Sequence, residues 1–379
     1  ILVVGSAVLA LTWFAEPLPE PEPHAEAREI EPVGGSVVCP MGDGREDTEL
    51  QAVVSRPAGT RDVPAISQFE TYQDGEREIA ELPPLPPGSS LHRTPSVDAD
   101  GALGLAWRAG PTVLHREWVF EGDELPAGMV AGGCPSALSQ RWYIPGMVTS
   151  GGSQALLRVT NPYPSDATIG LRFVGTDGPA APIALRNLSV EGRTSLEIDI
   201  NEFLPERDDL AAVVEVAAGR IAVQGLQLVR PEIGGIGGVS VLEAATEPSE
   251  IWTQPWILDR DDATSWLWIY NPSDRVAPVE LTYHTTEGGE LPDGLSEVLV
   301  DPGQLRRVEL RGTFPEDVQV VAVTARSDGA PIVVSNAVEL TSSDEARTAF
   351  TVQLGVPASD DSWTVSGGTT TNRVETLHL

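Results

Sequence analysis

The sequence contains no lysine and little cysteine or histidine. All 24 of its strongly basic residues are arginine, beside five histidines and two cysteines in 379 residues. Against them stand 56 acidic residues, which give a formal net charge of −32 at pH 7. A charge of this sign and size repels phosphate backbones, so the composition argues against nucleic acid as a partner.

The sequence also lacks the usual signatures of catalytic and metal sites. A structural zinc site normally needs four ligands, and two cysteines with scattered histidines do not supply them. We find no phosphate-binding glycine loop, nucleophile elbow or zinc-protease helix motif. We therefore expect no catalytic residue, no metal and no cofactor. The enzymatic alternative is a hydrolase whose pair of acidic residues comes together only in the folded protein. The acidic loops Asp208-Asp209 and Asp259–Asp262 could attract Ca²⁺, but we expect them to be solvated.

A long uncharged run occurs only at the start of the chain. Residues 1–15 carry no charge, and a membrane helix needs about 20 apolar residues. The chain begins without Met, so we expect residues 1–15 to be a truncated transmembrane anchor. The hydrophobic part of a cleaved signal peptide is the alternative. Residues 16–32 combine proline with many carboxylates, which is typical of an extended linker.

A repeat of 110 residues organises the rest of the chain. The segment from Trp142 to Asn161-Pro162 recurs from Trp252 to Asn271-Pro272, and a further copy opens at Trp363 and stops before its own Asn-Pro. We therefore expect the array to continue beyond Leu379. Repetition indicates an array of modules that each fold alone rather than a single catalytic body. The predicted domains after residue 32 are 33–134 (divergent N-terminal β domain), 135–248 (repeat 1), 249–360 (repeat 2) and 361–379 (start of a truncated repeat 3).

Apolar residues alternate with polar ones inside each repeat, as in half-buried strands. Ile169, Leu171 and Phe173 match Val279, Leu281 and Tyr283 position by position. About seven short strands per copy predict an all-β protein of tandem immunoglobulin-like β-sandwiches, after an N-terminal membrane helix and a Pro/Glu-rich spacer. In residues 33–134 the Trp…Asn-Pro signature is missing, and the proline-rich stretch 81–90 is expected to be a loop.

The two cysteines, Cys39 and Cys134, are most simply explained as a disulfide in an exported chain, with two free thiols as the alternative. The bond would close a loop of about 95 residues, worth on the order of 4 kcal/mol in the chain-entropy model. For the Asn-Pro pairs we favour a structural role. Proline ends strand pairing, and the asparagine side chain stabilises the turn.

The strand before Asn-Pro carries the candidate binding face. In the first copy Leu157 and Val159 point inward, which turns Arg158 and Thr160 to solvent. The offset of 110 then places Trp266, Trp268 and Tyr270 on the outward face of the second copy, with Trp252 and Trp256 close by. Such an aromatic stripe can stack on sugar rings or another ligand, or it can pack against a neighbouring domain, which we favour.

Several features of the sequence together point to a known family. They are the uncharged N-terminal run, the acidic Pro-rich spacer, Val-Cys39-Pro, a second cysteine shortly before a tryptophan and the Trp…Asn-Pro repeats. The chain resembles an actinobacterial family of membrane-anchored exported proteins with a domain of unknown function. The resemblance implies a single-pass protein of the cell membrane with its bulk outside, and it assigns no catalytic residue. Genes of this family are also associated with membrane glycosyltransferases.

These observations predict a non-enzymatic, extracytoplasmic envelope protein that presents tandem β-sandwich modules for protein or glycan binding. Its expected partners are the membrane, through the N-terminal helix, and an envelope glycan or a membrane glycosyltransferase complex. The alternative is a structural or assembly subunit of an envelope polysaccharide or glycosyltransferase machine.

Overall fold

The computed structural model describes an all-β protein, which confirms the predicted fold class at this level. The described residues are 34–40, 48–56, 66–95, 101–108, 113–120, 128–135, 138–229, 237–258, 263–285, 288–290, 297–310, 320–341 and 348–357. Within these ranges the regular structure consists of strands and two short 3-10 helices, and no helix is long and apolar enough to cross a membrane. The predicted anchor (1–15), linker (16–32) and third repeat copy (361–379) lie outside the described residues.

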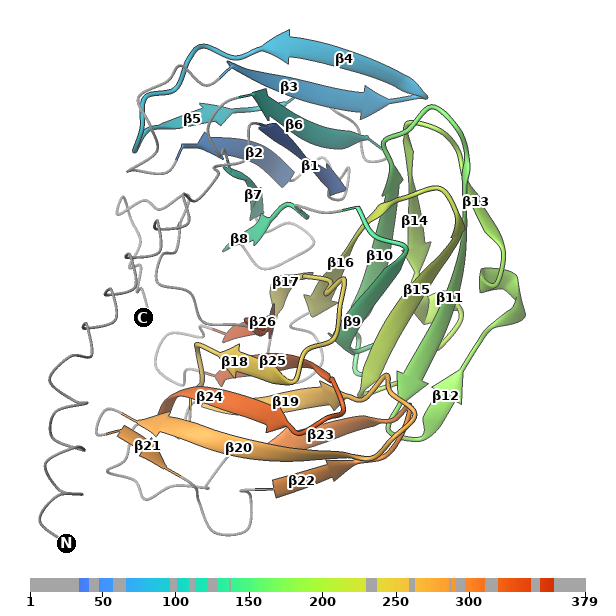
Figure 1. The fold of residues 1–379 in the computed structure, drawn as a ribbon, viewed down its shortest axis with the longest axis vertical. Coiled ribbons are helices and arrows are strands. Elements are labelled where there is room, and N and C mark those ends of the chain that lie inside the picture. The colour runs from blue at the N-terminus through green and yellow to red at the C-terminus, as the bar shows by residue number, and fades with distance from the viewer. Residues whose placement is uncertain are drawn as a thin grey trace, which may run out of the picture. The chain divides into compact units, whose positions relative to one another are not determined.

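The strands form six antiparallel sheets of four or five strands each (Figure 1). We call each consecutive pair of sheets a module. Module 1 contains β1 (Gly34–Pro40), β2 (Thr48–Ser55), β3 (Ile66–Gln73), β4 (Glu76–Glu81), β5 (Ser90–Arg93), β6 (Ala102–Arg108), β7 (Val113–Phe120) and β8 (Gly128–Gly133). Module 2 contains β9 (Arg141–Met147), β10 (Gln154–Asn161), β11 (Ala167–Gly175), β12 (Gly178–Ala180), β13 (Leu188–Val190), β14 (Thr194–Asp199), β15 (Leu210–Ala218), β16 (Ala222–Val229) and β17 (Gly238–Leu242), with 3-10 helices at Ile183–Leu185 and Ile200–Glu202. Module 3 contains β18 (Ile251–Gln254), β19 (Ala263–Tyr270), β20 (Ala277–Thr285), β21 (Gly288–Glu290), β22 (Glu297–Val300), β23 (Leu305–Glu309), β24 (Val320–Ser327), β25 (Val333–Thr341) and β26 (Thr348–Leu354).

The three modules share one strand order. Their first sheets run β1-β6-β3-β4, β9-β15-β11-β12 and β18-β24-β20-β21, and their second sheets run β5-β2-β7-β8, β14-β10-β16-β17 and β23-β19-β25-β26. Each module thus has eight or nine described strands rather than about seven. Module 1, expected to be a divergent β domain, therefore repeats the topology of the other two.

The predicted alternation in the repeats is confirmed. Ile169, Leu171 and Phe173 on β11 are buried, and so are Val279, Leu281 and Tyr283 on β20. These side chains and the inward residues of β10 and β19 belong to one hydrophobic core. The proline-rich stretch after β4 has no strand until Ser90, as its composition predicts.

The asparagines of the Asn-Pro pairs fasten a turn, which confirms their structural interpretation. Asn161 Nδ2 donates to the carbonyl oxygens of Ser165 (2.8 Å) and Val190 (3.1 Å). Asn271 Nδ2 repeats this with Arg275 O (2.7 Å) and Val300 O (2.9 Å). Both side chains are buried, so these bonds satisfy carbonyl groups that water cannot reach.

Arg56 occupies the same place in module 1. Its backbone NH donates to Ser89 O and its carbonyl accepts from Gly88 N, as Asn271 does with Gln304 and Gly303. Its guanidinium Nη1 donates to Leu85 O at 2.7 Å, the counterpart of the bond from Asn271 to Val300 O. Pro57 follows Arg56 in the sequence, so Arg-Pro replaces Asn-Pro in this module.

Modules 2 and 3 are not separate hydrophobic bodies. One continuous core of buried residues runs from Trp142 through both of them to Val352, whereas module 1 has its own core around Leu103 and Leu105. Modules 2 and 3 therefore share a core, and the expectation that each module folds independently stays a prediction. The boundaries assigned to the predicted domains stay predictions.

The predicted disulfide is confirmed. Cys39 at the end of β1 is bonded to Cys134, which follows β8, and the two Cα atoms are 4.8 Å apart. Since these strands open and close module 1, the bond joins its two ends.

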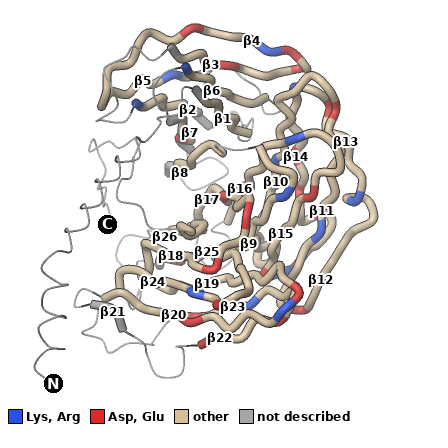
Figure 2. Tube along the Cα trace, viewed as in Figure 1, with Lys and Arg blue, Asp and Glu red and all other residues tan. Residues whose placement is uncertain are grey.

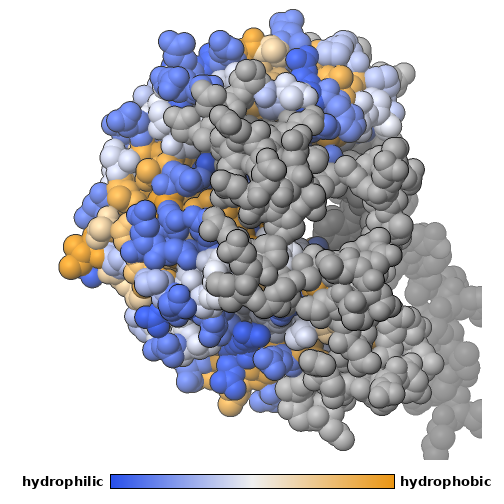
Figure 3. Space-filling model, turned by 180° about the vertical axis from the view of Figure 1, so that it is seen from behind, coloured by the Kyte–Doolittle hydropathy of each residue, from blue (hydrophilic) through white to orange (hydrophobic). Residues whose placement is uncertain are grey.

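Charged residues of both signs are spread over the strands of all three modules rather than gathered on one (Figure 2). On the face shown in Figure 3, hydrophilic side chains surround smaller hydrophobic areas. Large apolar side chains that stand clearly exposed among the described residues belong to different modules: Ile79, Tyr163, Ile183, Val276 and Leu299.

Candidate functional site

The aromatic stripe of the repeat is buried, not turned to solvent. Trp266, Trp268 and Tyr270 expose 4%, 0% and 1% of their surface. They lie on β19 as the repeat predicts. Module 2 covers Trp268 and Tyr270, whereas Trp266 lies against Phe350 and Arg307 of its own module. The predicted outward direction thus does not leave these side chains open to solvent. They are packed instead, which is the use that the sequence favours.

Polar contacts fix this interface. Trp268 Nε1 donates to Asp209 Oδ1 at 2.6 Å, and Arg172 Nη1 donates to the Tyr270 hydroxyl at 3.3 Å. Module 2 makes room for Trp268 at Gly146, where a Cβ atom would approach the indole to 2.9 Å. Gly146 also has a φ of +105°, which disfavours any other residue.

The other two candidate tryptophans lie elsewhere. Trp252 on β18 is inside module 3, and its Nε1 donates to Ile332 O at 2.7 Å. Trp256 is half-buried, and its carbonyl accepts from Asn336 Nδ2. The five predicted binding residues therefore do not share one open surface.

The matching face of β10 is covered in the same way by module 1. Leu156, Arg158 and Thr160 are buried, although the alternation had turned Arg158 and Thr160 to solvent. Strand β10 contacts β1, as β19 contacts β9, and Ser195 Oγ on β14 donates to Gly101 O in module 1. Modules 2 and 3 thus each dock the outer face of the second sheet on the first strand of the preceding module.

The junction of modules 1 and 2 contains an unusual arginine. Arg116 on β7 is fully buried, and its three guanidinium nitrogens have no hydrogen-bond acceptor among the described residues. The guanidinium lies 4.4 Å from the ring centroid of Trp118. Burial, together with the like charge of Arg158, lowers the pKa of Arg116 to about 9, while Glu243 acts in the opposite direction. Arg158 itself pairs with Glu197.

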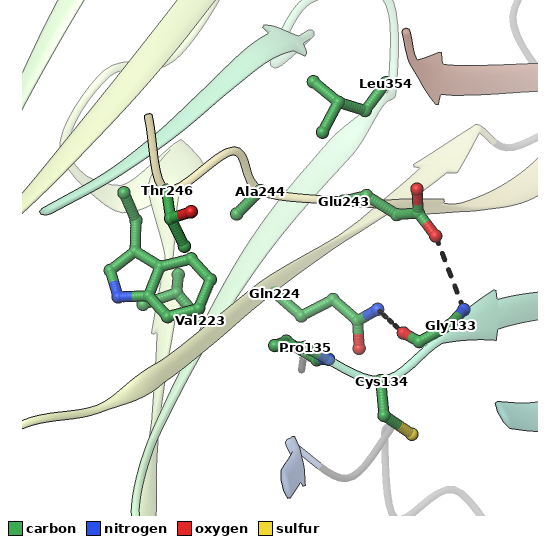
Figure 4. A pocket seen from close by; sticks show the side chains of 10 residues that line it. Gly133, Cys134, Pro135, Val223, Gln224, Glu243, Ala244, Thr246 and Leu354 are labelled. Atoms are coloured by element: carbon green, nitrogen blue, oxygen red, sulfur yellow. Dashed lines mark hydrogen bonds between the residues drawn. The ribbon is translucent and has the colours of Figure 1, made fainter. Parts of the chain in front are cut away.

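A pocket of about 240 Å³ lies where the three modules meet (Figure 4). The last strands of the modules, β8, β17 and β26, converge there, with β17 in contact with the other two. The pocket is partly open to solvent. Its walls come from all three modules: Gly133, Cys134, Pro135, Trp142, Val223, Gln224, Glu243, Ala244, Thr246 and Leu354.

Hydrogen bonds across the junction shape this pocket. Gly133 NH of module 1 donates to Glu243 Oε1 at 3.4 Å, and Gln224 Nε2 donates to Gly133 O at 3.2 Å (Figure 4). Desolvation raises the pKa of Glu243, and the Gly133 NH and the charge of Arg116 partly counteract it. The Glu243 side chain nevertheless remains accessible to solvent. No motif marks these residues in the sequence, because folding alone brings them together.

The acidic loops do not form a cation site in the described part of the chain. Asp208 accepts from the Ser150 hydroxyl, and Asp209 accepts from Trp268. The segment from Asp259 to Asp262 lies outside the described residues. Among those that are described, no three His, Cys, Asp or Glu side chains gather as metal ligands.

Residues 96–377 match DUF5719, a family of unknown function. The chain belongs to this family. The DUF5719 match spans modules 2 and 3 and the last strands of module 1, so it includes the outer faces of β10 and β19 and the whole pocket. It leaves β1 to β5 outside.

None of the curated proteins compared with this DUF5719 chain matches it. Among solved structures, a Thermotoga maritima protein described as Thermotoga maritima 1070 is 16% identical over 29% of this chain and 95% of its own, with a TM-score of 0.25. The Anabaena sensory rhodopsin transducer is 22% identical over 24% of this chain and 90% of its own, with a TM-score of 0.20. Similarity this low carries no argument about function.

Proposed function

We propose that the chain is a non-enzymatic, extracytoplasmic envelope protein whose modules form one rigid platform for a protein or glycan partner. The observation that supports this proposal most directly is the burial of the outer face of β19. Three aromatic side chains that could have served as an exposed binding surface are instead buried in a single core that modules 2 and 3 share. Because large side chains of β19 are buried against module 2, they fix the geometry between modules 2 and 3.

Two further features support the placement outside the cytoplasm. The Cys39–Cys134 disulfide is typical of chains that fold in an oxidising compartment. The uncharged run at residues 1–15 and the acidic spacer at 16–32 fit a membrane anchor with a stalk. Within this proposal the modules are immunoglobulin-like β-sandwiches, held away from the bilayer by that stalk.

The rigidity of the platform is testable with spin labels on modules 2 and 3. Asn187 and Glu297 are exposed and lie on different modules, so cysteine substitutions there accept labels without disturbing the core. We expect a single narrow distance distribution by double electron–electron resonance. A broad distribution in the otherwise unchanged protein would show that the modules move independently and would refute the platform.

The second candidate is a structural or assembly subunit of an envelope polysaccharide or glycosyltransferase machine. The observation that favours it is the same burial of Trp266, Trp268 and Tyr270, which removes the expected glycan-stacking face from the surface. Cross-linking in native envelope, followed by mass spectrometry, separates the two candidates. Recovery of a membrane glycosyltransferase or transporter supports the assembly role, whereas recovery of polysaccharide without such an enzyme supports direct glycan binding.

A further inference from the structure

The pocket at the junction of the three modules is a place where a small ligand would contact every part of the platform. Binding sites lie preferentially at such domain junctions. At about 240 Å³ the pocket is smaller than the roughly 300–1,000 Å³ of sites for drug-sized ligands, so its occupant is one small ring rather than a stretch of polymer.

The polar side chains that line the pocket offer mainly hydrogen-bond acceptors. Gln224 uses its amide NH₂ on Gly133 O, which leaves its carbonyl oxygen as the free end of the side chain. Glu243 takes the Gly133 NH on one carboxylate oxygen, and the Thr246 hydroxyl completes the set (Figure 4). Acceptors gathered in this way fit a ligand rich in donors, such as ring hydroxyls or an ammonium group.

The charge around the pocket decides between these two donors. Glu243 is the formally charged residue among those that line the pocket, and buried Arg116 lies near enough to interact with it electrostatically. The two opposite charges offset each other, so the pocket gains little from a cation. The protein as a whole carries a charge of −32, which disfavours an anion.

The rest of the lining is apolar. Trp142, Val223, Ala244 and Leu354 contribute carbon atoms to the same pocket as these oxygen atoms. A sugar ring has this pattern itself, with hydroxyl groups at its rim and C–H bonds on its faces, and such faces pack on apolar and aromatic side chains.

We propose that this pocket binds a single neutral sugar residue, with Glu243, Gln224 and Thr246 accepting its hydroxyl hydrogens. The assignment rests on the proposed function, because it names the chemistry of one partner of the platform. The two can fail separately, since the spin-label distances report the platform with or without sugar.

Saturation-transfer NMR on the full chain tests the site with defined probes. These are the methyl glycosides of glucose, galactose, mannose and arabinose, with ethylammonium as the cationic comparator and glucuronate as the anionic one. We expect at least one methyl glycoside to give a saturable signal, and we expect neither comparator to displace it. A preference for ethylammonium or glucuronate would overturn the neutral-sugar assignment, and so would the absence of saturable binding by every glycoside.

Three variants and a control locate the binding. Glu243→Gln keeps the size of the side chain and removes its charge, so the affinity should fall about ten-fold, as expected when a charged hydrogen-bond acceptor becomes neutral. Thr246→Val keeps the shape and should also weaken binding. Ala244→Trp fills the pocket and should abolish the signal. Glu297→Gln, on an exposed residue outside the pocket, should bind as the unchanged protein does.

The thermal midpoint and near-ultraviolet circular dichroism of each variant show whether it is folded. If Ala244→Trp does not fold, Thr246→Val carries the test, because it changes one hydroxyl only. A glycoside signal that survives unchanged in the folded variants would place the sugar elsewhere and refute the site.

Discussion

At the scale of single residues, Arg116 is the largest departure from ordinary packing. Moving a guanidinium out of water costs several kcal/mol, whereas a buried cation–π contact such as that with Trp118 returns about 2 kcal/mol or somewhat more. No hydrogen-bond acceptor among the described residues supplies the difference, and Arg158 adds a like charge nearby. Arg116 therefore destabilises the fold at neutral pH, and a role at the junction would explain its presence.

Replacing Arg116 by methionine should accordingly stabilise the protein. Methionine fills a similar elongated space without a charge, so we expect the free energy of unfolding at pH 7 to rise by about 1–4 kcal/mol. Thermal and denaturant unfolding measure the change. Arg186→Met, at an exposed position, is the matched control and should shift stability by less than about 0.5 kcal/mol.

The same variant has a pH signature. Below pH 9 Arg116 is protonated in both the folded and the unfolded protein, so the full cost of burying the charge is present. Above pH 9 the folded protein releases this proton, while the unfolded chain keeps it to a much higher pH. The unfolded state then binds more protons, and the stability of the unchanged protein rises with pH relative to Arg116→Met. The difference between the two proteins should therefore narrow between pH 8 and 10.5. A constant gap, or a less stable variant, would contradict this account.

Sequence reasoning succeeded for residues whose role is local. Asn161 and Asn271 stabilise turns because an asparagine side chain reaches backbone groups a few residues away, and this reach follows from the residue type. Arg56 escaped notice because a guanidinium reaches the equivalent carbonyl by a different geometry. Arg116, Gln224 and Glu243 could not be found at all, since their surroundings come from other modules.

At the scale of elements, the outer faces of β10 and β19 decide the assembly of the modules. The alternation of side chains correctly separates the face toward the module core from the opposite face. It says nothing about what covers that opposite face. In both modules the preceding module forms part of the cover, and the repeat copies differ where docking requires it. Module 2 has Gly146 to admit Trp268, whereas the aligned residue of module 3 is Trp256.

Trp268→Ala tests the docking of β19. The side chain is fully buried and bonded to Asp209, so its removal should lower the free energy of unfolding by about 3–5 kcal/mol. Because the lost contacts lie between modules, hydrogen–deuterium exchange should increase in β9 and β19. Strands β2 and β7 of module 1 should keep their protection.

Trp256→Ala is the companion to this variant. Trp256 is only half-buried, so we expect a smaller loss of stability and little change in the exchange of β9. If Trp268→Ala left β9 as protected as before, β19 would not be the element that joins modules 2 and 3.

At the scale of the whole molecule, the sequence revealed the repeat but not its closure into one body. The strands, the turns and the disulfide follow from patterns within a hundred residues. The shared core and the pocket depend on side chains from Gly133 to Leu354, which no local pattern connects. The sequence also did not reveal that module 1 has the same strand order. Module 1 keeps the topology of the other two modules but lacks the Trp…Asn-Pro signature by which the repeats are recognised.

The net charge of −32 is also a property of the whole molecule. Charges of one sign repel one another more strongly in the compact state than in the expanded chain, so this excess should destabilise the fold at low ionic strength. Added salt shortens the range of the repulsion from about 30 Å at 0.01 M to about 8 Å at 0.15 M. We expect the thermal midpoint to rise by several degrees between these concentrations of NaCl, and by the same amount in KCl, because screening does not depend on the identity of the cation. A falling midpoint would mean that local ion pairs such as Arg158–Glu197 outweigh the general repulsion.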